Sequence, residues 1–437
     1  MASTYLTRTM GSATSRTKFT VSVWIKKSAV NSEDSDEKHI FNGYNSSNYR
    51  FMIYMTNTDQ LKIRNVDNGT ENVTYVSNAH YRDVSGWYHV VVRIDTSQAG
   101  GNRIRAYVNG EQITSWASST EPNQGADFAL GTSSYSNILG SYAGTNHFWD
   151  GSMSHFHYCD GQSYLPSEFG STDSTTGEWK INASPNVTYG NQGFFMFKDD
   201  NAVTDRSGNS NNFTVGAGTL TKTEDCPSNV FCTWNPNFRS ARKDMELRNG
   251  NTFIFEQNSG DSGVSGTIAV SSGKWYWEQI IAQVNGTNAA VIGGLHTTED
   301  YNESPTDCNV ANACGLRANG NAFRGTTDLG NFTSANPNGD IFGVAFDADN
   351  GSMYFWKNGT ALNSGNAVIT GLDMTKTWIP FGVQHGGARV TTSTNFGNGY
   401  FQTTAVSSAG TNASNNGIFE YDVPSGYTAL STKGLNL

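Results

Sequence analysis

Apolar and polar residues alternate with a period of two along many short segments of this chain. The segments 18–27 (KFTVSVWIKK) and 87–95 (WYHVVVRID) are long examples, and Asn, Gly and Ser separate such segments from their neighbours. No segment keeps the 3.6-residue period of a helix over more than about two turns, apart from a single turn at 165–169. This alternation predicts strands that are buried on one face, and therefore an all-β protein.

The same pattern returns in the second half, beginning with a hairpin pattern over 266–284. Patterning is weak and charge is mixed over 225–252, so we place the domain boundary there. Many strands without intervening helices indicate antiparallel sandwiches or jelly rolls, and two of them account for the length. We expect two antiparallel β-sandwiches, at 1–232 and 253–404. A linker over 233–252 should join them, and a C-terminal strap should follow over 405–437.

Two strands far apart in the sequence end on the same dipeptide, at Asn109-Gly110 and at Asn358-Gly359. Both residue types tolerate a positive φ, which makes Asn-Gly a favoured two-residue hairpin turn. We expect each dipeptide to close a strand pair in a different sandwich. Their task is to fix register, and neither is expected to take part in chemistry.

Composition and charge narrow the classes of partner. Charged residues make up 15% of the chain, and 38 acidic against 28 basic residues give a formal net charge of −10. This argues against nucleic acid as a partner, because phosphate binding requires clustered Lys and Arg. The one basic cluster, at 238–243, lies beside Asp244 and Glu246 and is interpreted as a solvated linker.

The N-terminus and the cysteines bear on localisation. The first residues contain no apolar core, so we expect no signal peptide, and no run approaches the ~20 apolar residues of a membrane span, so we expect no membrane insertion. Two cysteine pairs share one spacing, Cys226/Cys232 and Cys308/Cys314. Each pair could close as a disulfide or stay as free thiols, and both alternatives are open.

No constellation of residues indicates catalysis, so we expect a protein that is not an enzyme and has no catalytic residues. A sandwich glucanase needs two carboxylates that alternate on one strand. The one dense acidic run, 33–37, lacks a carboxylate at position 35 and is interpreted as a loop. The sequence also lacks a Gly-x-Ser-x-Gly elbow after a strand and a phosphate-binding loop before a helix.

Two segments could hold a metal. The strand 155–159 (HFHYC) places His155 and His157 on one face, and its Phe and Tyr on the core face, so the histidines should point outward. The segment 347–350 (DADN) could ligate calcium, but it is also simply a turn, which is the interpretation we prefer. We expect no metal and no cofactor, because nothing in the sequence supports a calcium site.

Sugar-binding sites typically combine aromatic side chains with neighbouring polar groups, on loops at one rim of a sandwich. The segment 141–151 (SYAGTNHFWDG) offers such a set, and its ligand-binding candidates are Tyr142, Asn146, His147, Trp149 and Asp150. The alternative is that Phe148 and Trp149 cover the edge of a sandwich. A second loop of this kind is expected to carry His296, Tyr301 and Asn302.

The first half resembles the laminin-G-like or pentraxin-type sandwich of the concanavalin A-like fold. The resemblance lies in Trp24, in Trp87 with His89, in 107–110 (YVNG) and in 150–151 (DG). The continuation over 160–215 is similar to the version found in tailed-bacteriophage structural proteins, and the match covers about 1–232. The acidic residue that the family often has three positions after Gly151 is Ser154 here, which puts a family calcium site in doubt.

The second half resembles a SPRY domain over about 253–404. The matching segments are 271–278 (SSGKWYWE), 292–294 (IGG), 340–359 (DIFGVAFDADNGSMYFWKNG) and 378–383 (WIPFGV). SPRY domains are bent sandwiches that bind partners, usually through loops at one rim. The closing segment 424–435 is similar to the ends of phage proteins that carry the same pair of domains.

The two resemblances imply a non-enzymatic bacteriophage virion protein, made in the host cytoplasm and released by lysis. The expected role is that of a tail fibre or other receptor-binding appendage, with a host surface glycan or protein as partner. Other virion proteins are further partners, and we expect a homo-oligomer, with a trimer as the working assumption. The alternative is a capsid decoration or head-fibre protein that binds mainly other virion proteins.

Overall fold

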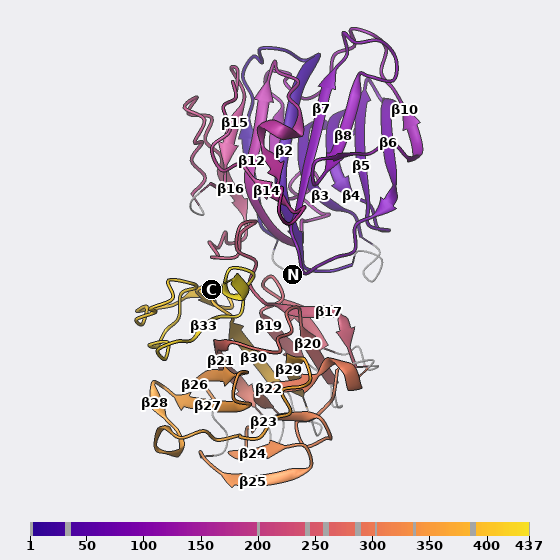
Figure 1. Ribbon diagram of the computed structural model, residues 1–437. Helices are drawn as coiled ribbons and strands as arrows, with labels where there is room; N and C mark the ends of the chain where they lie inside the picture. The colour runs from indigo at the N-terminus through magenta and orange to yellow at the C-terminus, as the bar shows by residue number, and fades with distance from the viewer. Residues whose placement is uncertain are drawn as a thin grey trace. The chain divides into compact units, whose positions relative to one another are not determined.

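A computed structural model describes residues 3–30, 36–198, 202–240, 245–256, 262–284, 290–301, 304–334, 338–384 and 390–436 (Figure 1). Contacts within the chain divide it into two compact units, unit 1 at 1–222 and unit 2 at 223–437. The described residues of both units are built from strands and turns, with short 3₁₀ turns and no α-helix. The all-β prediction is therefore confirmed.

Unit 1 contains an eight-stranded sheet and a six-stranded sheet, both antiparallel. Their strand orders are β10-β6-β5-β4-β3-β11-β1-β16 and β15-β12-β2-β7-β8-β9, and β13 and β14 form a separate hairpin. The bounds are β1 (Tyr5–Thr9), β2 (Lys18–Lys27), β3 (Lys38–Ser46), β4 (Tyr49–Met55), β5 (Gln60–Asp67), β6 (Thr70–His80), β7 (Tyr88–Asp95), β8 (Ile104–Val108), β9 (Glu111–Gln112), β10 (Trp116–Thr120), β11 (Ser136–Leu139), β12 (Gly151–Asp160), η2 (Pro166–Glu168), β13 (Gly170–Thr172), β14 (Trp179–Ile181), β15 (Phe194–Met196) and β16 (Thr214–Ala217).

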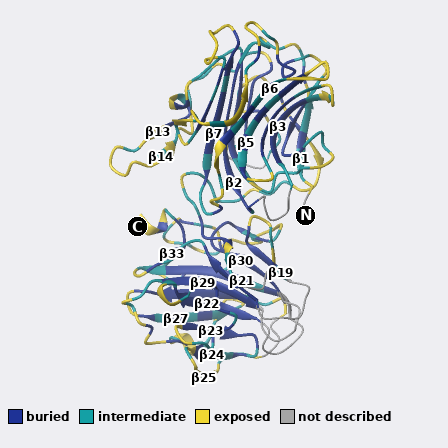
Figure 2. Ribbon diagram, turned by 90° about the vertical axis from the view of Figure 1, so that its right-hand side faces the viewer, coloured by how far each residue is buried: buried dark blue, intermediate teal, exposed yellow. Residues whose placement is uncertain are grey.

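The core of unit 1 lies between these two sheets, as alternation along the strands predicts. The inward residues of β4, among them Phe51 and Ile53, are fully buried, and Val23 and Phe156 of the other sheet join the same cluster. Phe51 meets Phe19 edge to face with ring centroids 5.5 Å apart. Figure 2 shows this buried interior between exposed turns.

Unit 2 is a second sandwich, of seven and eight strands. Their orders are β17-β20-β29-β22-β23-β24-β25 and β18-β19-β30-β21-β26-β27-β28. The bounds are β17 (Trp234–Arg239), β18 (Met245–Arg248), β19 (Phe253–Glu256), β20 (Ser262–Gly266), β21 (Lys274–Val284), β22 (Val291–Thr297), η3 (Thr298–Asp300), β23 (Ala313–Arg317), β24 (Asn321–Arg324), β25 (Thr327–Asn331), β26 (Ile341–Asp347), β27 (Ser352–Lys357), β28 (Thr360–Ala361), η4 (Asn363–Gly365), β29 (Trp378–Gln384), β30 (Val390–Asn395), β31 (Tyr400–Phe401), β32 (Thr404–Ala405), β33 (Thr428–Ala429) and η5 (Gly434–Asn436).

The segment expected as a linker, 233–252, differs from that expectation, because it contains β17 and β18 of unit 2. Trp234 is 2% exposed and packs on Phe396 with ring centroids 5.2 Å apart. Met245 is also part of the core. Weak alternation hid these strands, since each contributes only one or two large apolar side chains to the interior.

Both Asn-Gly dipeptides form the hairpin turns that the sequence predicts. Asn109 and Asn358 each have a φ of 49°, and their Oδ1 atoms accept the N–H of His89 at 2.8 Å and of Ile341 at 2.9 Å. A later aromatic ring covers each glycine: a Cβ on Gly110 would lie 2.5 Å from Trp179, and one on Gly359 would lie 2.8 Å from Tyr421. Each turn therefore also packs against an aromatic ring, at a position where a side chain would collide with that ring.

The C-terminal strap, 405–437, crosses one sheet of unit 2. Its β33 pairs in parallel with β21, and Phe419 meets Tyr276 edge to face at 5.0 Å. The fully buried carboxylate of Glu278 accepts the backbone N–H groups of Glu420 and Tyr421, each at 2.8 Å. The strap is thus tied to the sheet by a buried acid as well as by apolar contacts.

Candidate functional site

The expected contact segment, 141–151, connects β11 to β12 in unit 1. The N–H of Tyr142 donates to the carbonyl of Asn146 at 2.9 Å, and Gly144 between them has a φ of 75°. A Cβ on Gly144 would lie 2.9 Å from the ring of Tyr5. Glycine therefore satisfies both the turn and the close approach, and the loop is held tightly against β1.

Tyr142 stands at the centre of an aromatic and cationic group. Its ring centroid lies 5.5 Å from that of Tyr44, 5.3 Å from that of His39 and 6.0 Å from that of His147. The guanidinium carbon of Arg50 lies 5.9 Å from the same ring centroid, within cation–π range. The loop thus places Tyr142 over side chains of β3 and β4.

Alternation in β4 explains why these side chains meet. Phe51 and Ile53 face the core, so Arg50 and Tyr54 project from the opposite face of the sheet. Tyr54 stacks on His39 of β3 with centroids 4.5 Å apart and an interplanar angle of 5°. We name the resulting group the outer patch. His39 and Tyr54 are fully buried and form its floor, and its half-buried members are Tyr44, Arg50, Tyr142 and His147.

Two carboxylates hold the histidines of the outer patch in place. His147 Nδ1 and the carboxylate of Asp36 form a short hydrogen bond, which together with the charge of Lys38 outweighs burial and lowers the pKa of Asp36. Glu37 Oε2 lies 3.5 Å from His39 Nε2, and hydrogen bonding with His39 lowers the pKa of Glu37 despite its partial burial. Both carboxylates are therefore ionised at neutral pH.

The five predicted candidates do not all lie in the outer patch. Tyr142 and His147 do, and Asn146 is exposed at the end of the loop. Trp149 instead packs against the core of unit 1, and the carbonyl of Asp150 accepts the N–H of Ser28 at 3.1 Å.

The patch residues from β3 and β4 were not predicted, namely His39, Tyr44, Arg50 and Tyr54. The alternation over 50–55 marked Arg50 and Tyr54 as outward-facing, but the pattern could not show which loop would cover them.

The histidines of β12 are buried, which corrects the expectation that they point outward to solvent or to another part of the assembly. Phe156 faces the core as predicted. His157 is 1% exposed, stacks on Phe195 with centroids 4.0 Å apart and lies 2.9 Å from the Tyr189 hydroxyl. Burial lowers the pKa of His157 well below its usual range, helped by His155. The described residues contain no group of three side chains able to hold a metal ion.

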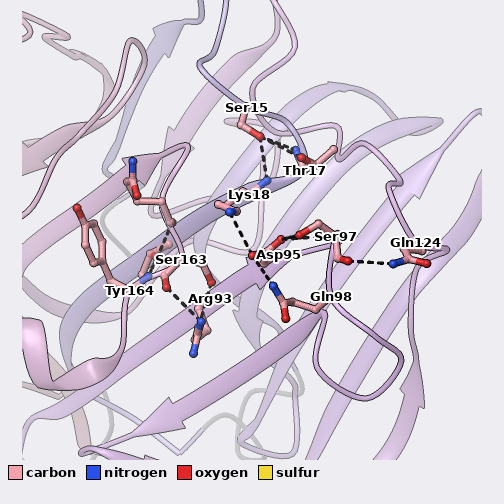
Figure 3. Close-up of polar contacts among 12 residues, drawn as sticks. Ser15, Thr17, Lys18, Arg93, Asp95, Ser97, Gln98, Gln124, Ser163 and Tyr164 are labelled. Carbon is pink, nitrogen blue, oxygen red and sulfur yellow. Dashed lines mark hydrogen bonds and ion pairs between the residues drawn. The ribbon is translucent and has the colours of Figure 1, made fainter.

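Figure 3 shows polar groups of unit 1 that bond to one another. Lys18 Nζ lies 3.3 Å from Asp95 Oδ2, and Gln98 donates to the same carboxylate oxygen at 3.1 Å. Arg93 donates to the Ser163 hydroxyl at 3.0 Å. These groups satisfy one another and join β2, β7 and the segment after β12, so the network is structural.

The second expected loop in unit 2 is partly a strand. His296 lies in β22, is fully buried, and its Nε2 lies 2.7 Å from the Ser265 hydroxyl, which corrects its placement on a loop. Burial lowers the pKa of His296 to about 4. Tyr301 contacts it at a centroid distance of 5.1 Å, whereas Asn302 lies outside the described residues.

The segment 347–350 is the turn that the sequence predicts. Asp347 Oδ1 accepts the N–H of Asp349 at 3.2 Å and that of Asn350 at 3.1 Å. All five cysteines are free thiols in this structure. In the part of the chain that the structure describes, no helix is long and apolar enough to cross a membrane.

Comparisons with known proteins gave one family match and several similar solved structures. Residues 2–162 match a family model for laminin G-like domains, described as the concanavalin A-like lectin/glucanases superfamily. Among solved structures, the chain is similar to the SPRY domain of human HERC1 (16% identity, 37% of this chain and 96% of that one, TM-score 0.31) and to the TRIM65 PSpry domain (13%, 38% and 88%, 0.29). It is also similar to a heptameric SAP-like pentraxin from Limulus polyphemus (16%, 49% and 89%, 0.30).

The search of curated proteins gave no match. The family match lies within unit 1, which carries the outer patch. Unit 1 is accordingly similar to a lectin-like β-sandwich of the concanavalin A-like kind, and such a domain fits a binding role.

Proposed function

We propose that this protein is a non-catalytic virion protein of a tailed bacteriophage, and that its outer patch recognises a glycan on the host surface. The phage assignment rests on the resemblance of 160–215 and of the closing segment 424–435 to segments of phage structural proteins. The observation that carries the binding role is the outer patch itself, where half-buried Tyr142 and Tyr44 lie beside Arg50 on a rigid sheet.

The chemistry of the outer patch suits a saccharide. Aromatic faces can stack on the apolar face of a sugar ring, and Arg50 and His147 can bond its hydroxyls. Only Tyr44, Arg50, Tyr142 and His147 of the patch are partly exposed, so a single site should bind weakly. Several copies in a homo-oligomer, taken here as a trimer, would convert weak contacts into firm attachment.

The direct test is binding of the purified protein to host cells and to their isolated surface polysaccharide. Tyr142→Ala should weaken binding about two- to tenfold per site, since one aromatic contact is worth roughly 0.5–1.5 kcal/mol. The matched control is Tyr49→Ala on β4, because Tyr49 contacts Tyr135 and Asn68 rather than the patch.

Competition with phage adsorption separates attachment from a purely structural role. The wild-type protein should block adsorption, and Tyr142→Ala should block it poorly. A protein that neither binds cells nor competes, and that locates to the capsid, would favour a head decoration and contradict receptor binding.

A further inference from the structure

A second aromatic surface lies on unit 2, along β27. Met353 and Phe355 of this strand face the core, so Tyr354 and Trp356 project from the opposite face of the sheet. Both are half-buried and pack beside Tyr276, whose ring centroid lies 6.4 Å from that of Trp356 at an angle of 73°. The floor of this surface is therefore rigid and only partly covered.

The C-terminal strap adds two more rings to the same surface. Tyr421 lies over Gly359 in the turn that follows β27, and a side chain at that glycine would collide with it. Tyr427 lies at the other end, with the Lys274 Nζ atom 5.8 Å from its ring centroid. We name the four half-buried rings the aromatic strip, and they are Tyr354, Trp356, Tyr421 and Tyr427.

Polar groups of both signs flank the aromatic strip. At one end Lys274 and Asp347 form an ion pair at 2.9 Å, and the charge of Asp347 adds to burial in raising the pKa of Tyr427. At the other end Asp340 lies 2.8 Å from Lys357 Nζ and accepts from the Asn358 amide at 2.7 Å. The carboxylates of Asp349 and Glu420 also act on the rings of Tyr427 and Tyr421, so the strip offers hydrogen-bond donors and acceptors in surroundings with more negative than positive charge.

The edges of β27 exclude one class of ligand. The strand pairs with β26 along its whole length on one side. On the other side Trp356 and Lys357 pair with β28, and Met353 bridges to Ile369. An extended peptide could not add itself as a further strand here, because such binding needs a free sheet edge.

We propose that the aromatic strip is a second ligand-binding surface and that it takes an uncharged saccharide. A sugar ring stacks on Trp356 and Tyr354, and its hydroxyls reach the paired polar groups at the two ends. An anionic polysaccharide is disfavoured because Asp349 and Glu420 add negative charge to the two ion pairs at the ends of the strip. The site is separate from the outer patch of unit 1, so its existence does not depend on the function proposed for that patch.

The test uses the full chain carrying Tyr142→Ala, in which binding at the outer patch is already weakened. Neutral gluco- and galacto-oligosaccharides and an anionic polyuronate are titrated by calorimetry. Neutral oligosaccharide binding should persist in this background, and adding Trp356→Ala should weaken it at least tenfold. Trp356→Phe should restore part of it, and Tyr400→Ala on β31 is the control for a ring elsewhere in unit 2.

The outcomes separate the two sites. If Tyr142→Ala alone loses all saccharide binding, the proposal that the aromatic strip binds saccharide is wrong, and the proposal for the outer patch is supported. Residual binding that Trp356→Ala does not change would also overturn the strip. Tighter binding of the polyuronate, sensitive to Trp356→Ala, would overturn the ligand class. Thermal unfolding of each variant shows that the protein has folded.

Discussion

The buried carboxylate of Glu278 should control how firmly the C-terminal strap is attached. Its two oxygens each accept one strap N–H at 2.8 Å, and Asn395 Nδ2 lies 3.4 Å from one of them. Glu278→Ala would leave the amides of Glu420 and Tyr421 buried without an acceptor. Each unsatisfied buried amide costs about 1–3 kcal/mol, so the variant should lose roughly 2–6 kcal/mol of folding free energy.

A graded series makes this expectation quantitative. Glu278→Gln keeps one acceptor oxygen and should lose about half as much as Glu278→Ala. Glu420→Ala is the control, because that carboxylate only bonds the exposed Ser407, and it should cost less than about 1 kcal/mol. Urea unfolding gives the free energies, and hydrogen exchange at 418–423 reports the strap itself.

The pH dependence provides a second measurement on the same residue. Burial raises the pKa of Glu278 to about 7 in the folded protein, above its usual value near 4.5. The folded state therefore binds the proton more tightly, and this contribution to stability is complete below pH ~4.5 and lost as pH rises through ~7, by at most about 3 kcal/mol. Glu278→Gln should abolish this decline.

Two results would refute this account of the strap. One is a loss below about 1 kcal/mol in Glu278→Ala, which would show that water satisfies the two strap amides. The other is unchanged exchange at 418–423 with unfolding of the whole unit, which would show that Glu278 supports the sheet rather than the strap.

Three further predictions follow from the structure. Gly110→Ala and Gly359→Ala should each destabilise the protein by about 2 kcal/mol or more, because φ is positive at both positions and an aromatic ring occupies the space of the new Cβ. Urea unfolding measures the loss. Gly101→Ala is the control for the effect of φ alone, because a Cβ there would meet no atom within 4 Å. Burial lowers the pKa of His89 to about 3 and that of His296 to about 4. The stability that these neutral histidines contribute is therefore present above pH ~6.5 and lost as pH falls toward the lowered pKa values. His89→Gln should make acid unfolding less steep. Because the pKa of Asp36 is lowered, its contribution to folding stability is present above pH ~4 and lost in more acidic solution. Asp36→Asn should raise the rate of hydrogen exchange at 142–147. An exchange rate equal to that of the wild type would contradict an anchoring role for the bond between Asp36 and His147.

Alternation and turn chemistry determined most of the local structure from sequence. The segment 18–27 reads as a strand and is one, and both Asn-Gly turns form as expected because only a few residue types accept their positive φ. The all-β class follows directly, since no segment carries a helical period. The strands within 233–252 were missed because short strands with one or two buried apolar side chains leave too weak a pattern.

The sites were decided by tertiary structure. Alternation shows that Tyr54 and His157 each lie on one of two faces, but it cannot say what covers that face. In unit 1 the face around His157 is covered by Tyr189 and Phe195 of the same unit. Tyr54 and His39 are also buried, and the partly exposed side chains lie beside them, at Tyr44, Arg50 and Tyr142. The sequence therefore determined which side chains share a face, and only long-range packing decided which faces were buried and which stayed partly exposed.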